Sequence, residues 1–282
     1  MTQHKLQNNR FEFKYVIDEQ RARAMRDYIR GYVEPDEHVQ DLRNCSYPVH
    51  SLYLDAPTLV LYPQTTLGLK NRFKLRIRFY DDVPTHPAFL EIKRRLNDAI
   101  RKERAAITRA GVDRLLKGRP LDPSDLVPAN GNGRAGAALE RFCHLVEELG
   151  AQPAAYVSYV REAYVSPGSE PLRVTFDRQI RGTAFDWRMG LSPPTTGVAA
   201  NVHGVVLELK FVDRFPHWMR DLVWAFDLQR RSVAKYVYCV AALGLRPGCW
   251  LEAQASFRLT GRSGCGPPVT AYGVCCDSVG FP

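Results

Sequence analysis

One stretch of alternating charge, Lys70 to Tyr80 (KNRFKLRIRFY), constrains the fold more than any other part of this sequence. Cations stand at every second position, and the positions between them are apolar. Because successive side chains of a β-strand point to opposite faces, this spacing predicts a strand with one basic and one apolar face. The basic residues are Arg72, Lys74, Arg76 and Arg78. Like charges about 7 Å apart repel one another, so a fold that encloses them needs an anion nearby.

The same alternation recurs along the chain, with about eight strands expected at 10–17, 50–55, 70–80, 88–96, within 97–107, and at 154–165, 172–180 and 204–212. A two-faced sheet with a solvated basic side would explain one such strand. At least five of them favour an α+β fold, an antiparallel β-barrel with a tunnel and surrounding helices. Its lumen would hold Lys14, Arg72, Lys74, Arg76, Arg78, Lys93, Arg161, Arg173 and Lys210, with Glu12, Glu91, Asp177 and Glu208 among them.

Helical spacing and capping residues predict the remaining elements. Helices are expected at 18–33 after Asp18, at 110–117, at 138–149, at 213–228, and at 233–243 after a Ser232 cap, with a turn or short helix at 56–68. The segments 34–46, 120–136 and 189–201 are interpreted as connections or loops. We expect one tunnel domain over 5–245 and a poorly ordered Gly/Pro/Cys-rich tail over 246–282.

The charge and composition of the chain narrow the range of possible binding partners. The chain has 282 residues with 39 Lys+Arg and 30 Asp+Glu, a net charge of 39 − 30 = +9. This excess indicates a polyanionic partner: nucleic acid, a membrane surface or phosphate compounds.

No apolar run approaches the roughly 18–20 residues of a membrane span, and the N-terminus has no apolar signal core, so we expect a cytoplasmic protein. The seven cysteines form no CxxC pair, which disfavours zinc and favours reduced thiols.

Phosphate is the anion that suits these residues best, because a guanidinium fork bonds two oxygens at once. The few lumen acids suit a divalent metal with oxygen ligands that bridges phosphates. The sequence shows no P-loop and no Ser/His/Asp or Cys/His arrangement. The histidines, such as His50, His144 and His217, stand singly and are interpreted as structural or solvated.

Several short motifs in order resemble those of the VTC domain, the vacuolar transporter chaperone type of polyphosphate polymerase in the triphosphate tunnel (CYTH-like) superfamily. They are RFEFKY, SLYLD, GLKNRFKLRIRFY, FLEIKRR, YVREAY, LRVTFDR, LELKF and AKYVYC, and they cover about residues 10–243. The resemblance implies a tunnel that binds a nucleoside triphosphate and a growing polyphosphate chain. It also implies a separate membrane protein as a partner.

The resemblance implies a role for particular residues. Phosphate contacts are implied for Lys14, Arg76, Arg78, Lys93, Arg161, Arg173 and Lys235, and strand parity adds Arg72, Lys74 and Lys210. Of these we assign Arg76, Arg78, Lys93, Arg161 and Arg173 to catalysis and the others to binding substrate phosphate. Glu208 is implied to bind a divalent ion, Mn²⁺ or Mg²⁺. Positioning and charge neutralisation would carry most of the rate, since a terminal phosphate oxygen needs no general base.

Two positions depart from the family pattern. Hydrolytic relatives begin with ExExK, whereas this chain has Arg10, Glu12 and Lys14, which favours polyanion holding over a metal-rich triphosphatase. Polymerases tend to show Ser-Lys in the last helix, whereas this chain has Ala234–Lys235, with Ser232 where a further Lys would stand.

The leading hypothesis is a polymerase that moves the γ-phosphoryl group of ATP to polyphosphate. The alternatives are a tunnel-type triphosphatase and a catalytically weak polyphosphate- or nucleotide-binding regulatory subunit. Nucleic-acid binding is disfavoured because the cations point into one lumen.

Overall fold

The computed structural model describes residues 10–39, 45–97, 99–127, 133–168 and 172–247. Apart from its first two residues, the predicted tail over 246–282 lies outside this part of the chain. The boundaries of the tunnel domain therefore stay a prediction.

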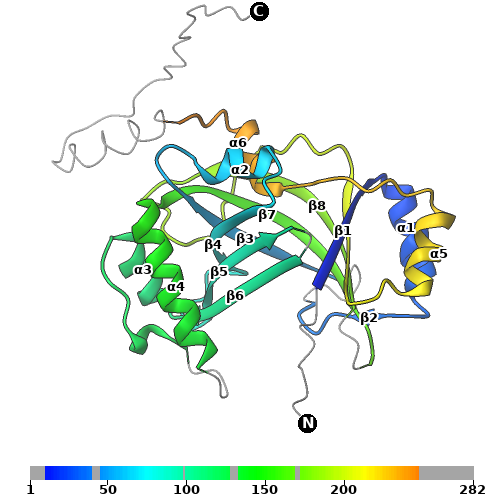
Figure 1. Ribbon diagram of the computed structural model, residues 1–282, viewed down its shortest axis with the longest axis horizontal. Helices are drawn as coiled ribbons and strands as arrows, with labels where there is room; N and C mark the ends of the chain where they lie inside the picture. The colour runs from blue at the N-terminus through cyan, green and yellow to red at the C-terminus, as the bar shows by residue number, and fades with distance from the viewer. Residues whose placement is uncertain (1–9, 40–44, 98, 128–132, 169–171, 248–282) are drawn as a thin grey trace, which may run out of the picture.

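One antiparallel sheet organises the molecule (Figure 1). Its strands are, in spatial order, β1 (Arg10–Ile17), β10 (Val205–Val212), β8 (Arg173–Ala184), β7 (Gln152–Val165), β3 (Ser46–Asp55), β4 (Asn71–Phe79), β5 (Ala88–Leu96) and β6 (Ala99–Ile107). The short strands β2 (Glu34–Pro35) and β9 (Val198–Ala199) pair with β7 and β8. The predicted α+β fold with about eight antiparallel strands is confirmed.

The sheet is curved but not closed. The edge strands β1 and β6 approach within 8 Å between Cα atoms. Within the described residues, however, no backbone ladder joins them. Side-chain alternation specifies which face of each strand is enclosed, but it does not specify whether the two edges share hydrogen bonds. The predicted barrel is therefore an open tunnel wall with a seam between β1 and β6.

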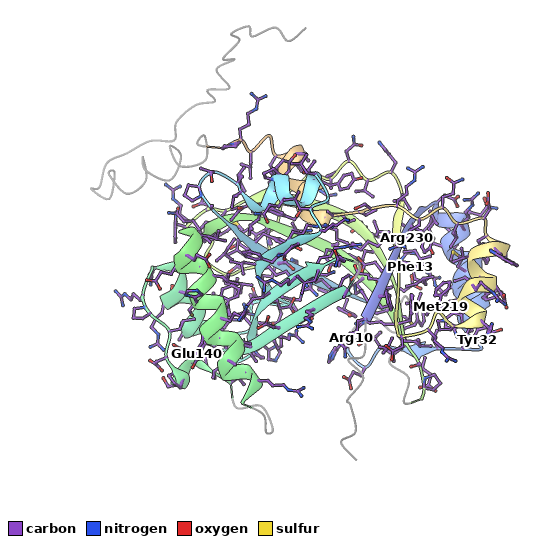
Figure 2. The ribbon with its side chains drawn as sticks, viewed as in Figure 1. Arg10, Phe13, Tyr32, Glu140, Met219 and Arg230 are labelled. Atoms are coloured by element: carbon purple, nitrogen blue, oxygen red, sulfur yellow. The ribbon has the colours of Figure 1, made fainter. Side chains whose placement is uncertain are left out.

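Helices cover the outer, apolar face at both ends of the sheet. α1 (Glu19–Ile29) and α5 (His217–Ala225) pack on β1, β8 and β10, with Met25 and Met219 fully buried. α3 (Arg109–Leu116) and α4 (Arg134–Leu149) pack on β5 and β6. Figure 2 shows Met219 turned inward from α5 and Glu140 on the outer surface of α4. These two cores hold the curvature from outside and leave the inner face for charged residues.

The last helix, α6 (Lys235–Ala242), packs instead on the inner face of β7 and β8, beside α2 (Leu61–Thr66). A Cβ on Gly182 would lie 2.8 Å from the Cβ of Cys239, so glycine allows this close approach. The Tyr236 hydroxyl donates to Asp55 at 2.7 Å and anchors the helix to β3. This docking places the first turn of α6 in the tunnel.

Several predicted boundaries were wrong. α6 begins at Lys235, and its N-cap is Ala234, which provides no side-chain hydrogen bond; Ser232 is therefore not the cap. α4 begins at Arg134, inside the segment interpreted as a loop. α1 and α5 are shorter than predicted, and α1 does begin after an Asp18 cap, which accepts from the Arg21 N–H at 2.7 Å. The sequence predictions used only the residue types that favour helix ends. Packing against the rest of the molecule decides at which residue each helix begins and ends.

Candidate functional site

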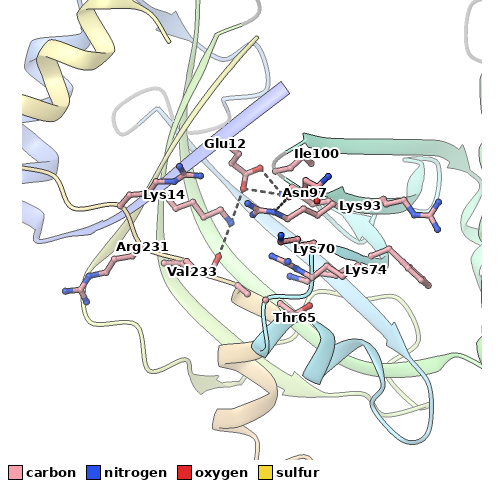
Figure 3. Close-up of a pocket in the computed structure, with 18 residues that line it drawn as sticks. Glu12, Lys14, Thr65, Lys70, Lys74, Lys93, Asn97, Ile100, Arg231 and Val233 are labelled. Atoms are coloured by element: carbon pink, nitrogen blue, oxygen red, sulfur yellow. Dashed lines mark hydrogen bonds and ion pairs between the residues drawn. The ribbon is translucent and has the colours of Figure 1, made fainter. Parts of the chain in front are cut away.

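The inner face of the sheet lines two connected cavities. We call the cavity of about 570 Å³ the ion-paired chamber and the cavity of about 800 Å³, drawn in Figure 3, the basic chamber. They share a wall made by Glu12, Lys14, Lys74, Lys93, Ile100 and Ala234. The two chambers therefore adjoin one another at these six residues.

All eleven predicted site residues line this double cavity. Lys14, Arg72, Lys74 and Lys93 border the basic chamber, and Arg76, Arg78, Arg161, Arg173, Lys210, Lys235 and Glu208 border the ion-paired chamber. Six strands (β1, β4, β5, β7, β8 and β10) and the helix α6 contribute these eleven residues, which strand parity brings to the same side. The structure thus gives the predicted residues one location, and their roles stay predictions.

Glu91 organises the first cluster of the ion-paired chamber. It is 0% exposed, and its carboxylate lies 2.6 Å from Arg76 and 2.5 Å from Lys102. Arg104 lies 3.2 Å and Arg78 3.9 Å from the same group. Burial alone would raise the pKa of Glu91, but these cations outweigh it and hold the pKa far below its ordinary value. Two lumen guanidinium groups are thereby fixed before any ligand binds.

Tyrosine hydroxyls complete the positioning of those guanidinium groups. Arg76 donates to the Tyr53 hydroxyl at 3.1 Å, and Arg78 donates to the Tyr159 hydroxyl at 3.2 Å. These neutral partners add no negative charge to that of Glu91, whereas a second carboxylate would cancel more of the positive charge that an anion could meet.

Glu208 organises the second cluster. Its carboxylate accepts from Lys235 at 2.8 Å and from Lys210 at 2.6 Å, while Lys14 lies at 3.3 Å and Arg161 at 3.4 Å. Burial alone would raise the pKa of Glu208, but these four cations hold it well below its ordinary value. Both oxygens of Glu208 are therefore already engaged.

Asp177 lies beneath the same cluster and fixes two of its cations. It accepts from both Nε and Nη2 of Arg161 at 2.7 Å, in a bidentate pair, and lies 2.6 Å from the Lys235 ammonium. Arg173, at the chamber's edge, lies 2.5 Å from Asp36 and donates to the Tyr47 hydroxyl at 2.7 Å. The ion-paired chamber is thus a set of cations, most of which are held in place by acids of the chain.

One ion pair crosses the seam of the sheet. Lys93 on β5 donates to Glu12 on β1 at 2.8 Å, and Lys14 lies 3.0 Å from the same carboxylate. Lys14 also donates to the Val233 carbonyl at 2.9 Å, which ties the segment before α6 to the wall (Figure 3). Side-chain charges join β1 to β5 where the backbone does not.

The basic chamber has a different electrostatic state. Nine Lys or Arg residues border it, and Glu12 is the only carboxylate among its described lining residues. Within the described chain, six of these cations form no ion pair: Lys70, Arg72, Lys74, Arg94, Arg230 and Arg231. The guanidinium carbon of Arg230 lies 4.0 Å from the centre of the Phe13 ring, and both residues are labelled in Figure 2. The buried Nε of Arg94 has no hydrogen-bond partner. This chamber therefore presents positive charge that the chain itself leaves uncompensated.

A family model for the VTC domain matches residues 9–244. This chain belongs to the VTC domain family. The match covers the whole tunnel and confirms the resemblance drawn from the strand motifs. Among curated proteins, none matches the sequence significantly.

Solved structures share the tunnel fold of this VTC domain only distantly. A candidate adenylate cyclase from Bacillus halodurans has a TM-score of 0.45 and 9% identity, covering 80% of this chain and 94% of that one. A candidate adenylyl cyclase from Hippeastrum with a dominant triphosphatase activity has a TM-score of 0.43 and 13% identity, covering 83% and 95%. A protein from Pyrococcus horikoshii has a TM-score of 0.41 and 11% identity, covering 82% and 98%. These likenesses are too distant to assign an activity.

The carboxylates of this VTC domain do not fit a resident metal ion. Within the described residues, no three His, Cys, Asp or Glu side chains come together as a ligand group. Glu208, the predicted metal ligand, is surrounded by three ammonium groups and a guanidinium, which repel a dication. A divalent ion would have to arrive already bound to phosphate oxygens.

Sequence reasoning left three cations of the ion-paired chamber out of the predicted site: Arg10 on β1, and Lys102 and Arg104 on β6. Both faces of β6 carry charge, since Arg101 and Glu103 stand on the opposite parity, so alternation gave no signal. The pairing register of β5 and β6 would have given such a signal, because Arg104 is the cross-strand partner of Glu91. Of the histidines named from the sequence, His50 has its Nδ1 2.8 Å from the Ser158 hydroxyl, and His144 and His217 border neither chamber, whereas His38 borders the ion-paired chamber.

Proposed function

We propose that this VTC domain is a polyphosphate polymerase that transfers the γ-phosphoryl group of ATP to a polyphosphate chain. The observation that carries the proposal is a pair of adjoining cavities on the inner face of the curved sheet, one with cations held by acids and the other with uncompensated cations. Such a lumen fits a linear anion of repeating phosphates, and membership of the VTC domain family supports the polymerase reading. An open surface would suit a nucleic acid better, so we propose no nucleic-acid partner.

The transfer needs positioning more than proton chemistry. A terminal phosphate oxygen of the polymer forms a bond to the γ-phosphorus as the bond from that phosphorus to the β–γ bridging oxygen breaks, and ADP leaves with the electron pair. Arg76, Arg78, Lys93, Arg161 and Arg173 would neutralise charge on the transferring group. Since Glu91 and Asp177 already hold Arg76 and Arg161, little reorganisation remains for the reaction step.

The two chambers suit the two substrates differently. Rings border the ion-paired chamber at Phe11, Tyr47, Tyr80 and Phe211, and such rings provide faces for a nucleobase. The basic chamber has only Phe73 among its described aromatic lining residues. We therefore assign the nucleotide to the ion-paired chamber and the polymer to the basic chamber, where Lys14, Arg72 and Lys74 would contact phosphates.

Lys210 and Lys235 would bind phosphate by exchanging a carboxylate partner for a phosphate oxygen. The pKa of Lys210 is lowered to about 8, chiefly because burial disfavours its charge, although Glu208 opposes the shift. A bound phosphate would restore the charge of this amine. Mn²⁺ or Mg²⁺ carried by the phosphates would supply charge neutralisation when bound, and because four cations already engage Glu208 we assign it no part in holding the ion.

Two observations bear on the alternatives. The lumen acids are all engaged by cations, which favours holding a polyanion over a metal-rich triphosphatase. Ala234 gives α6 no hydroxyl at its N-cap, which favours the weakly catalytic regulatory subunit.

Within the described residues no helix is long and apolar enough to cross a membrane. We propose a cytoplasmic protein with a separate membrane partner.

A turnover assay tests these readings together. The purified protein is incubated with ATP and Mn²⁺, and long-chain polyphosphate and free phosphate are followed in the same samples, alongside Arg76→Ala and Glu208→Gln. The exposed Arg30→Ala on the outside of α1 is the matched control. Polyphosphate from the wild type and the control, lost in both tunnel variants, supports the polymerase. Free phosphate alone indicates a triphosphatase. Tight polyphosphate binding without turnover indicates a binding subunit.

A further inference from the structure

Lys74 occupies an unusual place in the tunnel. It projects from β4 at the wall shared by the two chambers and is partly buried. Its cross-strand partner on β5 is another cation, Lys93. Within the described residues, its ammonium group makes no ion pair or hydrogen bond. Figure 3 shows Lys14, Lys74 and Lys93 extending into the cavity from three strands.

Every element around Lys74 adds positive charge or a carboxylate that is already engaged. Its own strand has Arg72 and Arg76 on the same face, and α6 brings Lys235 to the ion-paired chamber. On β1, Glu12 is held by Lys14 and Lys93.

The remaining acids and the nearest hydroxyl are also occupied. Glu91 on β5 is held by Arg76, and Glu208 on β10 is held by Lys210 and Lys235. The Tyr53 hydroxyl on β3 accepts from Arg76. None of the described acids pairs with Lys74, so an anion from outside would stabilise the charge on its amine.

This setting destabilises the charged form of the amine in the empty tunnel. Burial, together with Lys14, Lys93, Arg72 and Arg76, holds the pKa of Lys74 well below its ordinary value. A chain of phosphates across the junction would reverse the balance, because each phosphate oxygen stabilises an ammonium group and screens the neighbouring cations.

We propose that Lys74 takes up a proton when a phosphate chain crosses the junction between the two chambers. The amine lone pair binds one proton from solvent, and the resulting ammonium group donates hydrogen bonds to the chain; no other bond forms or breaks. The proposal rests on the proposed function only in requiring a phosphate chain in the tunnel. It makes Lys74 a residue that favours ligands long enough to span both chambers.

Calorimetric titration tests this directly. Tripolyphosphate and long-chain polyphosphate are titrated into the full chain at about pH 8, where terminal phosphates have lost their second proton, in two buffers with different heats of ionisation. The buffer difference gives the number of protons taken up per chain bound. Lys74→Arg carries a permanent charge, so it should bind long-chain polyphosphate yet take up about one proton fewer than the wild type.

Controls make the result specific to Lys74. Lys117→Arg repeats the substitution at an exposed lysine outside both chambers, at the C-cap of α3, and should match the wild type. Lys74→Met should bind more weakly and show the same deficit of one proton. Equal uptake by Lys74→Arg and wild type would overturn the proposal, as would a deficit found in Lys102→Arg instead. Failure of the wild type to bind either probe would contradict the proposed function as well, whereas turnover plays no part in the measurement.

Discussion

The ion-paired chamber and the basic chamber are lined by the same residue types in opposite electrostatic states. In the first, buried acids such as Glu91, Asp177 and Glu208 hold most of the cations in place. In the second, six cations have no acid of the described chain beside them. A buried ion pair fixes the positions of its side chains but costs desolvation free energy. Unpaired cations attract an anion more strongly but repel one another. The comparison indicates that one chamber is built for orientation and the other for affinity.

Removing Glu91 should have the largest effect. Glu91→Gln leaves Arg76 and Arg78 as buried charges without a counter-ion, and breaking such a pair costs about 3–5 kcal/mol. The free energy of unfolding, measured by urea denaturation, should fall by that amount and recover in part when tripolyphosphate is added. Glu103→Gln, on the partly exposed outer face of β6, is the control, with a change within about 0.5 kcal/mol. Equal losses in both variants would show that Glu91 plays no special part.

Neutralising the basic chamber should change binding but not folding. The double variant Lys70→Ala/Arg72→Ala removes charges that have no acid partner, so its unfolding free energy should stay within about 0.5 kcal/mol of the wild type. Its affinity for long-chain polyphosphate should fall about tenfold, with a weaker dependence on salt. Calorimetry at two salt concentrations measures both. Arg30→Ala, which removes a positive charge from the surface outside the chambers, should leave the affinity unchanged. A loss of affinity in this variant would mean that net charge alone matters.

The pH dependence of binding should reflect the amines of the ion-paired chamber. Burial, although opposed by Glu91, lowers the pKa of Lys102 to about 7. The amine is charged below that pH and neutral above it, and an anion binds the charged form. Affinity for tripolyphosphate should therefore fall about fivefold between pH 7 and pH 8 through this group alone. In Lys102→Arg, which stays charged, the fall should be smaller. An affinity that rises with pH would contradict the sign of this argument.

The smallest expected effect concerns the shared wall. Ala234 is already extended at the N-cap of α6, so Ala234→Ser should satisfy a free N–H and stabilise the fold by about 0.5–1 kcal/mol. Ser232→Ala should change the stability by less than that, because Ser232 does not cap the helix. Thermal unfolding of both variants measures the difference. A loss in Ser232→Ala without a gain in Ala234→Ser would place the cap where the sequence suggested.

Much of this architecture could be predicted because alternation is a local signal. The parity of Arg76 and Arg78 in one strand, and of Arg161 and Lys210 in others, required only the two-residue period of a strand. The ion pairing could not be predicted, because it depends on register: Arg76 meets Glu91 only when β4 and β5 align as they do. The same holds for Glu208, whose four cations come from β1, β7, β10 and α6.

The seam between β1 and β6 has a mechanical consequence. Every other neighbouring pair of the eight-strand path is joined by backbone hydrogen bonds, whereas this line is crossed by the Lys93–Glu12 contact between side chains. Widening the tunnel there breaks no ladder and costs about what one partly buried ion pair costs. Dissolved salt weakens such a contact, and a phosphate chain competes for its lysine. Among the described strands, the tunnel can thus widen along this one line, and a phosphate chain bound there would help to open it.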